Sequence, residues 1–255
     1  DLIRNRERSD APVDSEVSFL LFEQRGGARC LLVSYSAHPT VIGSQNLEFT
    51  GDYPGFLMQH LSALGDAEVI YLGGAVGSMG HRAPEGGGEF ERAELMGKQL
   101  AERVHGALGS ISLNDDRSET NVEVIGMPMA LPPYQVRLNR ALRFSKHLLP
   151  LLGVDHDAWL QGLRIGRRVM VGTPADFCGE ISVALKREAA AKAIDLWVLS
   201  FNGDYVGYIS PDEYYRDLDS DGSLGYERGV MSWIGPDQEA YFRHLINELV
   251  SHLFP

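Results

Sequence analysis

The sequence predicts an α/β protein in which layered, mixed β-sheets carry flanking helices. Apolar residues recur with the period of a strand in some stretches and of a helix in others, and the two kinds alternate along the chain. The chain has 255 residues, 44% of them hydrophobic, which is enough to bury a substantial core. We therefore expect one α/β domain over residues 1–255, or the C-terminal portion of one.

The periodicity also predicts where each element lies. Strands are expected at 16–24, 29–37, 68–74, 120–129, 165–172 and 195–202. Helices are expected at 53–64, 89–108, 135–149, 176–193 and 236–253. The first helix has a start signal, because Asp52 can act as its N-cap and Pro54 falls in its first turn.

Composition excludes several classes of function. The formal net charge of -12 argues against binding to the phosphate backbone of nucleic acids. No stretch reaches the ~20 consecutive apolar residues of a membrane span, and the polar N-terminus has no signal-peptide pattern. Cys30 and Cys178 are too few for a disulfide scaffold and lack metal-motif spacing, and whether they pair stays open.

Residue types that bind metals gather at the predicted strand ends. They lie in the segments 35–55, 174–180 and 202–215 and at Tyr226–Glu227, which supply a His, a carboxylate and paired tyrosines. This spacing is too wide for a zinc finger and suits a catalytic site assembled from distant loops.

For two of these residues, His38 and Asp176, the sequence allows either metal binding or a purely structural role. His38 follows an apolar strand and precedes Pro39, which favours an extended backbone; its imidazole can bind zinc or hydrogen-bond loop backbone. Asp176 can bind a metal or stabilise the start of the predicted helix. Glu180, one turn further on, is the obvious substitute for Asp176.

The glycine-rich loop 73–81 has two possible functional roles, and its simpler alternative is a tight connection from strand to loop. Its backbone N–H groups can stabilise an oxyanion, because glycine permits close approach. Alternatively, Ser78 is a nucleophile with His81 nearby, although Val76 breaks the G-x-S-x-G pattern of a nucleophile elbow.

A later acidic stretch partly fits a calcium loop. Asp217, Asp219 and Asp221 have the right spacing, but the twelfth position is Arg228 rather than Glu. We therefore favour a solvated loop that can cover the approach to Tyr226.

Seven short motifs in order resemble the neutral/alkaline, non-lysosomal ceramidase family of zinc-dependent amidases. They are NRERSDAPVDSEV at 5–17, HPT at 38–40, DYPG at 52–55, VIYLGGAVGSMGH at 69–81, GTPADF at 172–177, NGDYVGYI at 202–209 and GYERG at 225–229. The resemblance runs along nearly the whole chain.

The resemblance implies a site for one zinc ion. It assigns His38, Asp176 and Tyr208 as metal ligands and Tyr226 as a phenol that contacts the reacting carbonyl group. Tyr205 is expected only to pack. The family's serine nucleophile matches Gly74 here, so attack by metal-activated water is the simplest mechanism.

The resemblance also sets the expected context of the chain. Nothing before residue 38 is a His, whereas the family has a His-x-His segment upstream, so the chain resembles a catalytic domain lacking its N-terminal part. An N-terminal half of the same precursor is then the expected partner, with further His ligands. No C-terminal β-sandwich domain is expected. Family members are commonly secreted or periplasmic.

We therefore expect a zinc-dependent hydrolase that cleaves an amide bond of an N-acylated, lipid-like or amino-sugar-like substrate. Two alternatives stay open. One is a non-catalytic ceramidase-like binding or structural module, and the other is a metal-independent serine hydrolase that uses Ser78.

Overall fold

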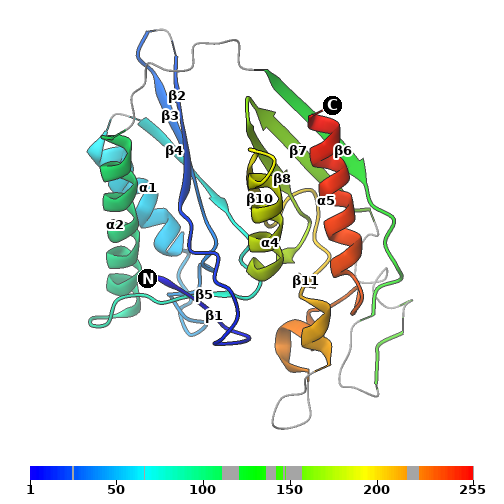
Figure 1. Ribbon diagram of the computed structural model, residues 1–255. Helices are drawn as coiled ribbons and strands as arrows, with labels where there is room; N and C mark the ends of the chain where they lie inside the picture. The colour runs from blue at the N-terminus through cyan, green and yellow to red at the C-terminus, as the bar shows by residue number, and fades with distance from the viewer. Residues whose placement is uncertain are drawn as a thin grey trace. The chain divides into compact units, whose positions relative to one another are not determined.

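The structure confirms the predicted α/β class and divides the chain into two compact units. The computed structural model describes residues 1–24, 26–65, 67–110, 121–135, 142–145, 147, 157–216 and 224–254. Unit 1 comprises Asp1–Gly74 and Met79–Glu119, and unit 2 comprises Ala75–Ser78 and Thr120–Pro255 (Figure 1). The expectation of a single domain over 1–255 stays a prediction.

Unit 1 is a three-stranded sheet with two helices. The strands are β2 (Ser18–Glu23), β3 (Arg29–Tyr35) and β4 (Ala67–Gly73), with β3 in the middle, antiparallel to β2 and parallel to β4. A separate short pair joins β1 (Ile3–Asn5) to β5 (Met79–His81). The helices are α1 (Asp52–Leu64) and α2 (Glu89–Leu108).

Helices α1 and α2 pack closely because a glycine lies at their crossing. A Cβ atom on Gly97 would lie 2.7 Å from the Leu57 nitrogen and 2.7 Å from the Tyr53 oxygen, both in the backbone of α1. Around this crossing the core of unit 1 contains fully buried side chains such as Leu57, Met96 and Leu100.

Unit 2 is a four-stranded sheet whose order is β10-β8-β7-β6. These strands are β6 (Val122–Pro128), β7 (Trp159–Ile165), β8 (Arg168–Gly172) and β10 (Asp195–Leu199); β8 and β10 are parallel, and β7 is antiparallel to β6 and β8. A short parallel pair, β9 (Asp176–Phe177) and β11 (Tyr208–Ile209), follows the ends of β8 and β10 along the chain.

The helices of unit 2 bury the apolar face of this sheet. They are α4 (Gly179–Ala190) and α5 (Glu239–Leu253), and α5 runs alongside β6 and β7 (Figure 1). Leu249 of α5 occupies the space that a side chain at Gly162 of β7 would need. Phe177 and Phe242 are fully buried, with ring centroids 5.9 Å apart.

Most predicted elements are confirmed, with ends that shift by one to a few residues. Strand β7 was not predicted; it forms a hairpin with β8 through Gly166, which has φ +61°. Glycine is unusual inside a strand, and Gly162 is there because α5 packs onto it. Most of the helix expected at 135–149 lies outside the described residues.

Two predicted helix starts are wrong. Helix α4 begins at Gly179, so Asp176 lies in β9 rather than in the first turn of a helix. In α1 the N-cap is Gly51, and Asp52 has φ +50°. The Asp52 carboxylate instead accepts a hydrogen bond from the Ile42 N–H at 2.8 Å, which ties the preceding loop to the helix.

The helix crossing in unit 1 gives a testable prediction. Gly97→Ala should lower the free energy of unfolding by ~1–3 kcal/mol, because the added methyl group must displace the backbone of α1. Gly106→Ala in the same helix is the matched control: a Cβ there meets nothing within 4 Å, so it should raise stability by ~0.5–1 kcal/mol. Urea unfolding followed by circular dichroism measures both; equal effects would contradict the close crossing.

Candidate active site

The candidate site of unit 2 is built on the carboxyl ends of the parallel strands β8 and β10. The loops after these strands are joined by backbone hydrogen bonds: Thr173 N–H donates to the Leu199 oxygen at 2.8 Å, and Val206 N–H donates to the Pro174 oxygen at 2.7 Å. Asp176 N–H then donates to the Gly207 oxygen at 3.1 Å. Ligand sites of α/β sheets commonly lie at such strand ends.

Asp176 is a buried carboxylate held beside two tyrosines. Only 3% of the residue is exposed, and its Oδ2 accepts a hydrogen bond from the Tyr205 hydroxyl. Tyr208 is its register partner in the β9–β11 pair. Burial, and then the hydrogen bond to Asp176, raise the pKa of Tyr205, so this phenol stays protonated and donates to the carboxylate.

Tyr205 therefore donates a hydrogen bond to Asp176 as well as packing, which corrects the prediction that it only packs. Its ring also makes an edge contact with Trp233, with centroids 5.2 Å apart. One signal in the sequence could have located Tyr205: an Asn-Gly-Asp turn at 202–204, shortly after a buried strand, brings the following residues back toward the strand end.

Tyr208 and Tyr226 lie side by side with different exposure. Their ring centroids are 6.2 Å apart in an edge arrangement; Tyr208 is 5% exposed and Tyr226 is 62% exposed. Tyr208 N–H donates to the Met231 oxygen at 2.9 Å, and any Cβ at Gly207 (φ +84°) would overlap that oxygen. A buried phenol near the carboxylate thus adjoins one that reaches solvent.

Tyr226 begins a π-helical turn, Tyr226–Val230, that follows Gly225 at φ +67°. Such turns are rare and frequently occur at functional sites. The acidic residues Asp217, Asp219 and Asp221, considered above as a calcium loop, lie outside the described residues.

Glu180 and Ser78 belong to a hydrogen-bond network inside unit 2. The Glu180 carboxylate accepts hydrogen bonds from the Ser78 hydroxyl and, at 2.5 Å, from the Tyr214 hydroxyl. Ser78 is fully buried, and its Oγ accepts the Gly179 N–H of α4 at 3.3 Å. These contacts make Glu180 a poor substitute for Asp176, and they place the Ser78 hydroxyl in an internal network.

Gly74 directly follows β4 in unit 1, and its N–H group already has a hydrogen-bond acceptor. That N–H donates to the Tyr35 oxygen at 3.0 Å, and a Cβ at this position would lie 3.1 Å from the backbone of Ser36. In unit 2, the Gly77 N–H donates to the Phe177 oxygen at 2.8 Å. Close backbone contacts thus account for both glycines, since a Cβ at Gly77 would lie 2.6 Å from the Asp176 oxygen, and both N–H groups donate within the protein.

His38 lies three residues after β3, near the carboxyl ends of the parallel pair β3 and β4 in unit 1. Its N–H donates to the Met79 oxygen at 2.9 Å, and its own carbonyl accepts the Thr40 N–H at 2.9 Å. The side chain is partly buried. His38 thus belongs to unit 1, whereas Asp176 and Tyr208 belong to unit 2.

Both cysteines are free thiols. Cys30 is partly exposed and Cys178 is fully buried, 3.5 Å from the Ser210 hydroxyl. Burial, and then the nearby carboxylates of Glu180 and Glu227, raise the pKa of the Cys178 thiol well above its usual value. It therefore lacks the thiolate character of a nucleophile or metal ligand.

The donor set of unit 2 suits a hard or borderline cation but is incomplete. Asp176 offers a carboxylate and Tyr208 a phenol oxygen, and zinc commonly adds imidazole to such ligands. Within the described residues, no cluster of three or more His, Cys, Asp or Glu side chains is positioned to hold a metal.

Solved structures share this fold. A crystal structure of neutral ceramidase from Pseudomonas aeruginosa superposes with a TM-score of 0.71 at 16% sequence identity, over 96% of this chain and 49% of that one. A structure of ceramidase complexed with C2 superposes with a TM-score of 0.71 at 15% sequence identity, over 96% of this chain and 50% of that one. The chain has a neutral ceramidase-like fold.

This chain spans about half the length of those ceramidase chains. No protein-family model and no curated protein matches the sequence. No helix in the described parts of the chain is long and apolar enough to cross a membrane.

The hydrogen bond to Asp176 gives a prediction that needs no substrate. Tyr205→Phe should lower the free energy of unfolding by ~1–3 kcal/mol, because a buried carboxylate loses a donor. Tyr226→Phe removes the same hydroxyl group from an exposed side chain, so its free energy of unfolding should stay within ~0.5 kcal/mol of that of the parent. Thermal or urea unfolding compares them; a neutral Tyr205→Phe would remove this residue from the site.

Proposed function

We propose that this chain forms part of a metal-dependent hydrolase that cleaves an amide bond of an N-acylated, lipid-like or amino-sugar-like substrate. The observation that carries the proposal is the buried Asp176 carboxylate, set between Tyr205 and Tyr208 where the loops of two parallel strands meet. The neutral ceramidase-like fold supports the same class of reaction.

In this proposal His38, Asp176 and Tyr208 hold one zinc ion. When bound, the cation supplies Lewis-acid polarisation of the amide carbonyl and a more acidic water. Asp176 contributes the negative charge that favours a cation, and the Tyr205 hydroxyl fixes the orientation of that carboxylate.

Tyr226 acts on the substrate rather than on the metal. Its side chain is largely exposed while its ring contacts Tyr208, so its hydroxyl is accessible to a substrate bound beside the site. As the carbonyl oxygen gains negative charge, the phenol donates a hydrogen bond to it. The proposal also expects further His ligands and a general base from the part of the ceramidase fold that this chain does not span, and an exported location.

The test combines metal content with turnover of a fluorogenic N-octanoyl amide. Purified parent chain, together with any polypeptide that co-purifies, should carry about one zinc per chain by elemental mass spectrometry. Asp176→Asn and Tyr208→Phe should lose both zinc and activity. Tyr226→Phe should keep zinc and lower kcat by ~10²–10³-fold, because only the oxyanion donor is lost.

Asp195→Asn is the matched control for the loss of a carboxylate. Asp195 pairs with Arg168 at 2.6 Å on the partly exposed edge of the sheet, so metal and activity should not change. Activity that resists chelators and disappears in Ser78→Ala would replace the proposal with a serine hydrolase. A folded chain with neither zinc nor turnover, even with its co-purifying partner, would favour a non-catalytic module.

A further inference from the structure

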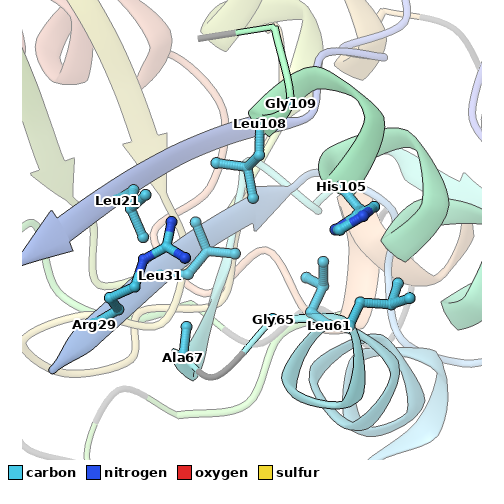
Figure 2. A pocket seen from close by; sticks show the side chains of 10 residues that line it. Leu21, Arg29, Leu31, Leu61, Gly65, Ala67, His105, Leu108 and Gly109 are labelled. Atoms are coloured by element: carbon cyan, nitrogen blue, oxygen red, sulfur yellow. The ribbon is translucent and has the colours of Figure 1, made fainter. Parts of the chain in front are cut away.

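Unit 1 contains a cavity of about 230 Å³ whose residues take no part in the proposed reaction. It lies between the start of β3 and the C-terminal ends of α1 and α2, as Figure 2 shows. Leu31 and Leu61, 2% and 4% exposed, are its most buried side chains, while Leu64 and His105 are exposed. The walls are mainly leucine: Leu21, Leu31, Leu61, Leu64 and Leu108.

One charged side chain stands among these apolar walls. Arg29, the first residue of β3, lines the cavity from the strand side, with His105 of α2 across from it in Figure 2. The Nε atom of Arg29 is buried and has no hydrogen-bond partner among the described residues. A buried donor left without an acceptor costs free energy that a bound anion would recover.

Neighbouring carboxylates do not relieve this cost. Glu23 is the cross-strand partner of Arg29, and Glu68 follows the Ala67 that pairs with Arg29 on the other side. Among the described residues, neither forms an ion pair with the guanidinium. The guanidinium group is therefore available to a carboxylate, which its planar set of donors matches well.

The helix ends restrict how such a ligand can lie. Gly65 and Gly109 are the C-caps of α1 and α2, and both line the cavity. Helix C-termini carry partial negative charge and repel anions. A ligand must therefore place a single negative charge beside Arg29 and an uncharged tail along the leucines.

From these observations we infer that this cavity binds a monocarboxylate with a short apolar tail. At ~30 Å³ for each water-sized group, the volume corresponds to roughly eight non-hydrogen atoms, which is the size of hexanoate. Burial of the tail against leucine supplies affinity, and the guanidinium selects the charged head. The inference uses none of the residues of the proposed active site, so it can hold or fail independently.

The test is titration of the full chain with hexanoate and with hexanamide, its uncharged analogue of the same size, by calorimetry or ligand-observed NMR. Hexanoate should bind at least about tenfold more tightly than hexanamide. Arg29→Met keeps the apolar stem and should erase that difference. Arg82→Met removes an exposed arginine of unit 1 that does not line the cavity, and should change nothing.

A second variant tests the location without disturbing the charge. Gly65 lines the cavity with an extended φ of -169°, and a Cβ there meets nothing within 4 Å, so Gly65→Phe should fold, add bulk at the cavity wall and weaken hexanoate binding. Circular dichroism confirms folding of each variant. Equal binding of hexanoate by the parent and a folded Arg29→Met, or no saturable binding by the parent, would overturn the inference. Arg29 would then serve only to offset the negative helix ends.

Discussion

The parallel pairing of β8 with β10 is the constraint on which the candidate site depends. Because the strands are in register and run in the same direction, their following loops emerge at one edge and can hydrogen-bond to each other. Those hydrogen bonds continue into the β9–β11 pair, which sets Asp176 opposite Tyr208. Without this pairing, two residues 32 positions apart in the chain would have no reason to meet.

The same arrangement occurs in unit 1 on a smaller scale. There β3 and β4 are the parallel pair, and His38 follows the first of them as Asp176 follows β8. A proposed ligand thus follows a parallel strand in each unit: His38 in unit 1, and Asp176 in unit 2. In both cases a short, largely buried strand precedes the proposed ligand and fixes its position at the edge of the sheet.

Two nearby carboxylates of unit 2 show how environment decides a role. Glu180 lies inside a network in which Ser78 and Tyr214 each donate to it, and the Tyr214 carbonyl in turn accepts a hydrogen bond from Arg228 at 2.8 Å. Such a network fixes the start of α4 and the turn at Asp212–Tyr215. Asp176 instead faces phenols, one of which adjoins the exposed Tyr226.

Much of this arrangement could be predicted from the sequence, because strand ends are visible as changes in apolar period. His38 and Asp176 follow such strand ends, and the resemblance to a known family singles out His38, Asp176 and Tyr208; their role as metal ligands stays a prediction. Tyr205 and β7 were missed for a physical reason: the first gains its partner only through tertiary pairing, and the glycine inside the second is explained only by the packing of α5. The role of the Gly74 amide likewise depends on Tyr35, which is distant in sequence.

The division of the chain between the units has a consequence for dissecting the protein. Residues Ala75–Ser78 belong to unit 2 although unit 1 flanks them on both sides, so the backbone passes between the units three times. No single cut can separate the units cleanly: a fragment ending near residue 119 would carry away Ser78 and leave α4 without its partner. Complementary halves made for reassembly would need this four-residue segment supplied to both.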